Sequence, residues 1–285
     1  MANSPVLLFC VGATKASTSW LFRFLLGHPD CYLRSVKELH VFDRRDAGRA
    51  EAQIASLRLD IARLQFAPVL NRRLTAKIKD REALIDVLRD GGDDAYLGYL
   101  TEGIRAQKVV ADITPSYSLL SVDRLRKMAA LLPDVRFVYL MRDPVARLWS
   151  HVRMSAFRSG GTIEADAARI FDATLAGQQP DILDRSDYRA AIARLDAAVD
   201  PSKLLVMFQE VMLTLPGIAR LCTFLGLSNR TADFGKRVHF GPNLAMTEDQ
   251  LLRARAVLRP QYEFAANRFG SLPDQWLRNM GKGVA

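Results

Sequence analysis

The stretch VLLFCVGATKASTSW, residues 6–20, decides the fold. Its first part, Val6–Val11, contains only apolar side chains and ends at Gly12, which is the pattern of a strand buried on both faces. A helix is predicted next, because apolar side chains recur at helical spacing from Trp20 onward. The segment between them, residues 13–19, is rich in small and hydroxyl-bearing residues. We therefore expect a buried strand, a tight turn and a helix.

The rest of the chain repeats this alternation of apolar strand and helix. Further strands are predicted at Lys108–Asp112, Val135–Met141 and Lys203–Phe208. Further helices are predicted at Ser121–Leu132, Asp143–Phe157, Tyr188–Val199 and Pro216–Leu225, and a last one from the Thr247–Gln250 capping box to Gly270. Such alternation is typical of βαβ units, so the sequence predicts an α/β fold around a central, mainly parallel sheet.

We expect one domain over residues 1–285, because no Pro-, Gly- or Ser-rich linker divides the chain. Two regions depart from the alternation. Residues 44–107 are charged and helical in pattern, with interruptions expected at Gly91-Gly92 and Gly98, and indicate a helical insertion over the sheet. Residues 159–185 are glycine-containing and indicate a mobile cover.

Composition and charge narrow the class of protein. The chain has 285 residues, of which 49% are hydrophobic, as expected for a globular protein and not for a disordered one. It carries 40 Lys+Arg against 31 Asp+Glu, a formal net charge of +9. This excess indicates an anionic partner, and leaves nucleic acid, an anionic membrane surface and a phosphorylated small molecule open.

The sequence predicts a cytoplasmic protein without a transmembrane segment. The longest stretch free of charged residues, Met1–Thr14, is shorter than the roughly 20 residues of a spanning helix and lacks the basic start of a signal peptide. The three cysteines, Cys10, Cys31 and Cys222, are odd in number and show no C-x-x-C spacing. They therefore indicate neither a disulfide framework nor a zinc site.

The turn after the first strand is a candidate anion site. Backbone N–H groups and the positive end of the helix dipole converge there, Lys15 adds a full charge, and Thr18 and Ser19 add hydroxyl donors. The spacing is not that of the nucleotide triphosphatase loop, because Lys15 follows no glycine and precedes Ala16, which has no hydroxyl for magnesium. The alternative is that these small residues only cap the helix.

This turn resembles the 5′-phosphosulfate loop, G-x-x-K-x-G-T-T, of sulfotransferases that use 3′-phosphoadenosine 5′-phosphosulfate (PAPS). Ser17 stands at the usual glycine position and Ser19 at the second threonine. We expect a negative φ at Ser17, because a side chain is then accommodated without strain. The resemblance implies that the donor is bound by Lys15, Ala16, Ser17, Thr18, Ser19 and Trp20.

A second segment, Phe137–His151, resembles the 3′-phosphate motif of the same family. A strand ends in Arg142-Asp143-Pro144, and Ser150 follows eight residues after the arginine. Arg142 leaves the carboxyl end of a strand, where open α/β sheets bind ligands, and a guanidinium engages phosphate bidentately. The resemblance implies that Arg142 and Ser150 bind the donor; the alternative is a strand-to-helix turn with a surface arginine.

A third segment, Lys37–Asp43, resembles the K-E-x-H-F-F block of bacterial sulfotransferases and the E-V-H-F-F-D block of heparan sulfate sulfotransferases. The resemblance implies that Glu38 is the general base, that Lys15 stabilises the leaving group and that His40 orients or polarises the acceptor. Taken alone, Glu38 would be a solvated charge and His40 a core histidine.

Weaker matches extend the resemblance from about residue 5 to residue 270. Asp112–Tyr117 resembles the (E)K-(S/T)-P-x-Y segment, with Ile113 in place of the lysine, and Ser186–Tyr188 resembles the G-x-Y segment. The resemblance makes Tyr188 a candidate donor-binding residue. The late loop that closes on the nucleotide has no plain counterpart, and its candidates are Lys236, Arg237 and Asn243.

The resemblance implies a P-loop-like, three-layer α/β/α fold. It implies sulfuryl transfer without a metal from PAPS to a hydroxyl or amine of a glycan, lipid or small metabolite, with adenosine 3′,5′-bisphosphate as product, in a bacterial enzyme. The enzyme alternative is a P-loop small-molecule kinase that uses Mg-ATP. A nucleic-acid-binding protein is disfavoured, because basic residues are interleaved with acids, as in Lys79–Glu82.

Overall fold

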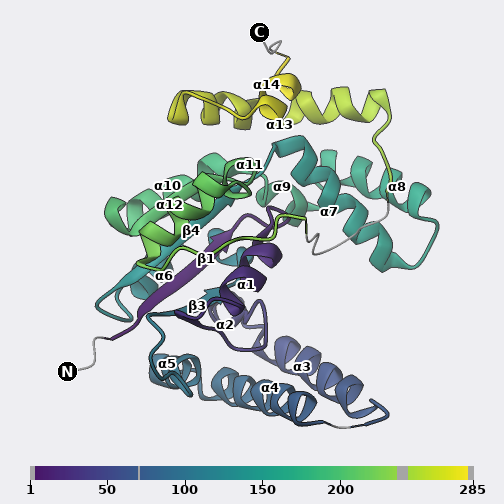
Figure 1. The fold of residues 1–285 in the computed structure, drawn as a ribbon. Helices are drawn as coiled ribbons and strands as arrows, with labels where there is room; N and C mark the ends of the chain where they lie inside the picture. The colour runs from purple at the N-terminus through teal and green to yellow at the C-terminus, as the bar shows by residue number, and fades with distance from the viewer. Residues whose placement is uncertain (1–3, 70, 236–242, 282–285) are drawn as a thin grey trace.

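The centre of the molecule is a five-stranded sheet in which all neighbouring strands run parallel, in the order β2-β3-β1-β4-β5 (Figure 1). The structure is a computed structural model and describes residues 4–69, 71–235 and 243–281. The strands are β1 (Val6–Gly12), β2 (Cys31–Tyr32), β3 (Val109–Ile113), β4 (Val135–Met141) and β5 (Leu204–Phe208). Consecutive residues of β1 and β4 are buried, so both faces of the sheet are covered. This is a P-loop-like α/β fold.

Helices fill the connections between the strands. The α-helices are α1 (Thr18–Leu26), α2 (Val41–Asp46), α3 (Ala50–Gln65), α4 (Arg72–Asp90), α5 (Asp93–Thr101), α6 (Val122–Ala129), α7 (Pro144–Ser159), α8 (Ile163–Leu175), α9 (Pro180–Asp184), α10 (Tyr188–Ala198), α11 (Gln209–Met212), α12 (Leu215–Leu225), α13 (Glu248–Phe269) and α14 (Asp274–Asn279). Two short 3-10 helices are η1 (Pro115–Leu119) and η2 (Pro201–Lys203). Figure 1 shows α3 and α4 as a hairpin below the sheet and α13 with α14 at the opposite end.

An aromatic cluster joins the sheet to the helices between β2 and β3. Phe9 of β1 lies 5.3 Å from Phe137 of β4, between ring centroids, and 6.1 Å from Phe42 of α2. Phe42 in turn packs edge-on against Tyr96 of α5 and Tyr117 of η1. All five rings are buried, and burial of each large side chain stabilises the fold by about 1.5–3 kcal/mol. The cluster therefore fixes the start of α2 against the carboxyl end of β1.

The long, regular elements confirm the sequence predictions. The predicted strands at 6–11, 108–112, 135–141 and 203–208 are present within one residue at each end. Asp143 caps α7, where its side chain accepts from the N–H of Ala146, and Thr247 forms the expected capping box with Gln250. The sequence gives no sign of β2 or α14, because two and six residues are too few to show a hydrophobic period.

The two irregular regions are helical in the structure. Gly91-Gly92 separates α4 from α5 as predicted, but the interruption expected at Gly98 is wrong, because Gly98 lies inside α5. One glycine destabilises a helix by about 1 kcal/mol, which is less than the stabilisation that α5 gains from burying Tyr96 and Tyr99. The expected cover, residues 159–185, contains α8 and α9, and α8 packs along α7. The mobility of this segment and the assignment of residues 1–285 to a single domain stay predictions.

Candidate active site

The candidate site lies at the carboxyl edge of the sheet, where the loops after β1, β2 and β4 come together. Open α/β sheets bind ligands at this edge. Among the described residues, only four besides glycines have a positive φ: Lys15 (72°), Ser17 (61°), Glu38 (61°) and His40 (55°). All four belong to the motifs selected from the sequence. Such backbone costs energy and clusters at functional sites, where the surrounding structure holds it.

The loop after β1 is held close to β4. A Cβ at Gly12 would lie 2.3 Å from Cε2 of Tyr139, so only glycine fits there, and the N–H of Ala13 donates to the carbonyl of Leu140 at 2.7 Å. The negative φ expected at Ser17 is wrong. Ser17 keeps the left-handed conformation that glycine would adopt, because this conformation starts α1 at this point.

The start of α1 is suited to an anion. Ser17 makes no side-chain cap, and the first turn contains no acidic residue, so no side chain neutralises the helix dipole there. The N–H of Ala16 donates back to Ala13, while Thr18 is buried and Ser19 half-buried at the helix start. Exposed N–H groups at such a start are a ready site for phosphate or sulfate.

Arg142 brings the first two sequence motifs together. It follows β4, and its Nη1 donates to the carbonyl oxygen of Lys15 at 3.0 Å. The hydroxyl of Tyr188, which is fully buried, donates to the carbonyl of Arg142 at 2.6 Å and accepts from its N–H at 3.3 Å. Burial lowers the pKa of Arg142. Tyr188 therefore fixes the backbone of Arg142. Ser150, the other residue of the second motif, lies half-buried farther along α7.

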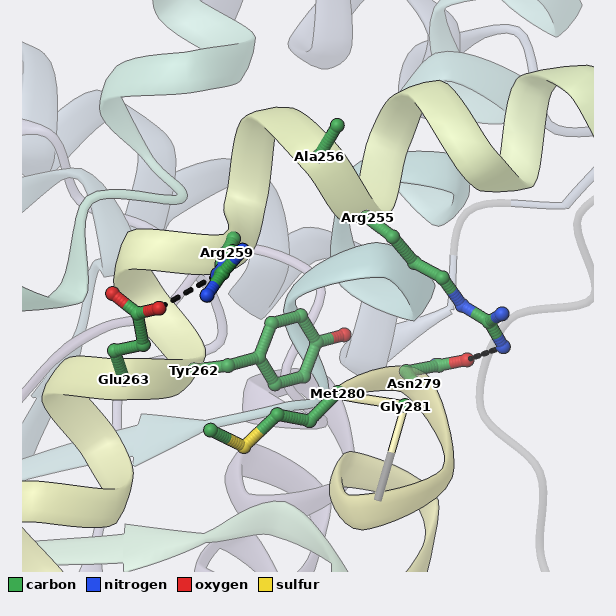
Figure 2. Close-up of a pocket in the computed structure, with 8 residues that line it drawn as sticks. All are labelled: Arg255, Ala256, Arg259, Tyr262, Glu263, Asn279, Met280 and Gly281. Atoms are coloured by element: carbon green, nitrogen blue, oxygen red, sulfur yellow. Dashed lines mark hydrogen bonds and ion pairs between the residues drawn. The ribbon is translucent and has the colours of Figure 1, made fainter. Parts of the chain in front are cut away.

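The C-terminal helices hold the turn behind Arg142. Asp143 accepts from the hydroxyl of Tyr262 at 2.7 Å and from the amide of Asn279 at 2.9 Å. Tyr262 and Asn279 also line a surface pocket of about 410 Å³ between α13 and α14 (Figure 2). Its arginines are engaged, Arg255 with Asn279 and Arg259 with Glu263. None of the sequence-predicted site residues lines this pocket, which supports the Arg142 turn from behind.

Positive charge is concentrated around the β1 loop. Burial, and next the charges of Arg142, Arg158 and Arg153, lower the pKa of Lys15 to about 8. Arg185 donates to the hydroxyl of Thr14 at 3.0 Å. Arg153, Arg158 and Arg185 are not among the residues predicted from the sequence. The only signal for Arg185 was its position directly before the Ser186–Tyr188 segment.

Glu38 and His40 form a charged group beside this positive cluster. Glu38 pairs with Lys37, and His40 places Nε2 3.7 Å from a Glu38 oxygen and Nδ1 2.8 Å from an oxygen of Asp43. Burial opposes both charges, but the hydrogen bonds and opposite charges outweigh it, lowering the pKa of Glu38 to about 2 and raising that of His40 to about 9. His40 is therefore a cation between two carboxylates at neutral pH.

A buried carboxylate anchors the Glu38 loop. Asp112, at the end of β3, accepts from the hydroxyls of Thr114 (2.6 Å), Tyr96 (2.8 Å) and Tyr117 (3.1 Å). Thr114 and Tyr117 in turn accept from the N–H groups of Leu39 and Val41, which flank His40, at 2.9 and 3.0 Å. Burial raises the pKa of Asp112 to about 6.

Two further sequence-predicted residues, Trp20 and Asn243, lie outside this cluster of contacts. The indole of Trp20 stacks between Phe24 and Phe234, and its Nε1 donates to the carbonyl of Asp233, so this ring packs the start of α1. Asn243 is exposed in the loop before α13. Lys236 and Arg237 lie outside the described residues.

Fold and site together define an α/β protein with a cluster of basic residues at the carboxyl ends of parallel strands. The chain belongs to the sulfotransferase family, whose model matches residues 5–231. The class of reaction is therefore sulfuryl transfer. A comparison with curated protein sequences gives no match.

Solved structures of sulfotransferases share the fold. A sulfotransferase from Alicyclobacillus acidocaldarius is 20% identical with a TM-score of 0.61, over 96% of this chain and 99% of that one. The sulfotransferase domain of the curacin biosynthetic pathway is 17% identical with a TM-score of 0.51, over the full length of both chains. The sulfotransferase domain of the olefin synthase of Synechococcus PCC 7002 is 15% identical with a TM-score of 0.50, over 89% of this chain and 94% of that one.

Within residues 4–69, 71–235 and 243–281, no three His, Cys, Asp or Glu side chains form a metal-binding group. None of the helices described in the structure has the length and the apolar run needed to cross a lipid bilayer.

Proposed function

We propose that the protein transfers the sulfuryl group of PAPS to a hydroxyl or amine of a glycan, lipid or small-metabolite acceptor. The observation that carries this proposal is the contact of Arg142 with the backbone of Lys15. It joins the two segments that resemble the 3′-phosphate and 5′-phosphosulfate motifs into one basic edge. A donor with phosphate at one end and phosphosulfate at the other needs cations at two such points.

On the donor side, the start of α1 and Lys15 would bind the 5′-phosphosulfate, and Arg142 with Ser150 the 3′-phosphate. Lys15 would stabilise the charge that develops on the bridging oxygen as the S–O bond to the leaving phosphate breaks. Loss of one preorganised donor of this kind typically raises the barrier by about 3–4 kcal/mol. Adenosine 3′,5′-bisphosphate would then leave as product.

On the acceptor side, Glu38 would take the proton from the attacking hydroxyl or amine as the new bond to sulfur forms. With a pKa of about 2, Glu38 is ionised and able to accept a proton, but it is a weak base while Lys37 and His40 hold it. We therefore propose that acceptor binding buries Glu38 further and loosens its pairing with Lys37, which raises its pKa. His40, held by Asp43, would orient the acceptor.

Three further parts of the proposal concern the metal, the cellular compartment and the source of the enzyme. Ala16, which follows Lys15, offers no hydroxyl for magnesium, so we propose chemistry without a metal, and no observation favours the kinase alternative. All three cysteines are buried and free, which supports a cytoplasmic enzyme. The likeness to a sulfotransferase from Alicyclobacillus acidocaldarius supports a bacterial one.

The test is transfer of radiolabel from sulfur-labelled PAPS to acceptors of each class, in the presence of a chelator. We expect labelled product with one class, product formation slowed by about 10²- to 10⁴-fold with Glu38→Gln, and normal product with Glu51→Gln, which changes an exposed carboxylate on α3. Transfer that required added magnesium, or phosphate transfer from ATP to the same acceptor, would contradict the proposal.

A further inference from the structure

The turn between α3 and α4 is the most exposed apolar part of the described chain. Nine large apolar side chains are exposed among the described residues, and three of them lie here: Leu59 (61% exposed), Phe66 (88%) and Val69 (73%). Leu59 lies in the last two turns of α3, and Phe66 directly follows this helix, seven residues or about two helical turns later. An exposed apolar tip of this kind indicates an interaction surface.

The same tip is strongly basic. Residues 57–77 contain five basic residues and one acidic residue, Asp60, which pairs with Arg63. Arg58, Arg72 and Arg73 are exposed, and no ion pair within the described part of the chain neutralises them. These basic residues are not part of the proposed donor site. They contribute to the net charge of +9, of which the motifs of Lys15 and Arg142 account for only two charges.

The tip projects from the molecule. The buried residues of the hairpin, such as Ile54 and Leu57 of α3 and Leu84 and Leu88 of α4, lie toward its base, which packs against α2 and α5. Figure 1 shows the connecting turn at the free end of the hairpin, beyond these contacts. An apolar tip that projects from the fold can enter a soft surface such as the headgroup region of a lipid bilayer.

We infer that this tip, formed by Leu59, Phe66 and Val69 with Arg58, Arg63, Arg72 and Arg73, docks the protein on an anionic lipid surface. Apolar side chains that enter the boundary between headgroups and acyl chains, ringed by arginines that contact phosphate, are the chemistry of interfacial binding. Neither the apolar nor the basic side chains suffice for membrane binding alone. Salt screens basic residues that lack apolar anchors, and three apolar side chains bury too little surface to hold the protein on the membrane.

The experiment is cosedimentation of the full-length protein with vesicles, without donor or acceptor, so its outcome is independent of the proposed function. Vesicles contain equal parts of phosphatidylglycerol and phosphatidylcholine, or phosphatidylcholine alone. We expect binding to the anionic vesicles only. Each basic residue near an anionic surface contributes about fivefold in partitioning, so Arg72→Gln with Arg73→Gln lowers binding roughly 25-fold.

Apolar variants and matched controls complete the test. Phe66→Ser with Val69→Ser abolishes binding, whereas Leu215→Ser and Arg220→Gln, exposed positions on α12, leave it unchanged. Unchanged melting temperatures show that the tip variants fold. Equal binding by wild type and the Phe66/Val69 variant, or equal binding to both vesicle types, would overturn the inference. So would concentration-dependent self-association, seen by light scattering, that the Phe66→Ser change removes.

Discussion

The two halves of the candidate site are built on the same edge of the sheet but differ in how their charges are compensated. Around the β1 loop, Lys15 lies among Arg142, Arg153 and Arg158, and mutual repulsion with burial lowers its pKa. Around Glu38, cations and carboxylates already neutralise one another. The first half therefore has an excess of positive charge, which suits an anionic ligand. In the second half the positive and negative charges balance, which suits the transfer of a proton.

The largest expected effect separates the two halves. Glu38→Gln removes the proton acceptor but leaves the donor half intact, so kcat falls by about 10²- to 10⁴-fold while the affinity for adenosine 3′,5′-bisphosphate is unchanged. Turnover is measured by label transfer to an identified acceptor, and affinity by calorimetry. Full activity of this variant would remove Glu38 as the base.

Arg142→Ala should instead lower the affinity for the donor nucleotide. Loss of a charge-assisted contact weakens binding of adenosine 3′,5′-bisphosphate by about 10- to 100-fold. Arg220→Ala, which removes an exposed arginine from α12, serves as the control. Equal affinities for the two variants would show that Arg142 does not bind the donor.

The anchor of the Glu38 loop offers a matched pair. Tyr117→Phe and Tyr96→Phe each remove one hydroxyl from Asp112, but only Tyr117 also accepts from the N–H of Val41 in that loop. We expect Tyr96→Phe to lower stability by about 1 kcal/mol in denaturant unfolding and Tyr117→Phe to lower it more, because the second change also leaves the N–H of Val41 without its acceptor. We expect kcat to fall about tenfold in Tyr117→Phe alone, since small displacements of a catalytic group are costly. Equal kcat in both variants would restrict Asp112 to a structural role.

The pH dependence of donor binding tests the positive half. The protonated form of Lys15 binds the anion, and its pKa is lowered to about 8. Affinity for adenosine 3′,5′-bisphosphate, whose phosphates are fully ionised above about pH 7, should therefore be constant from about pH 7 to 8 and fall by up to about tenfold per pH unit above pH 8. Lys15→Arg, whose side chain stays charged, should lack this fall. An unchanged profile in Lys15→Arg would assign the titration to another group.

The smallest effect concerns Ser17. A left-handed conformation costs a non-glycine residue about 1–2 kcal/mol, and replacing Ser17 by glycine removes this cost. Part of the gain is lost, because glycine has a higher conformational entropy in the unfolded state. Ser17→Gly should therefore raise the melting temperature slightly, by about 1–3 °C. Ser19→Gly, within α1, should lower it, and a lower melting temperature for Ser17→Gly would mean that its hydroxyl stabilises the loop.

Much of the fold could be predicted from the sequence, because buried parallel strands such as Val6–Gly12 are continuous apolar runs with clear ends. The motifs also led to Lys15, Arg142 and Glu38. Arg153, Arg158 and Arg185 could not be predicted, because only the tertiary packing of α7 and α9 against the β1 loop brings their charges together. The left-handed backbone at Ser17 could not be predicted either. The local preference of serine opposes this conformation, and the surrounding structure imposes it.

The central claim is that Lys15 and Arg142 form one site for the PAPS nucleotide, and calorimetric titration with adenosine 3′,5′-bisphosphate and with Mg-ATP tests it most directly. The account predicts that the bisphosphate binds without magnesium, and that both Lys15→Ala and Arg142→Ala weaken this binding. Tight binding of Mg-ATP with none of the bisphosphate would contradict it and favour a kinase.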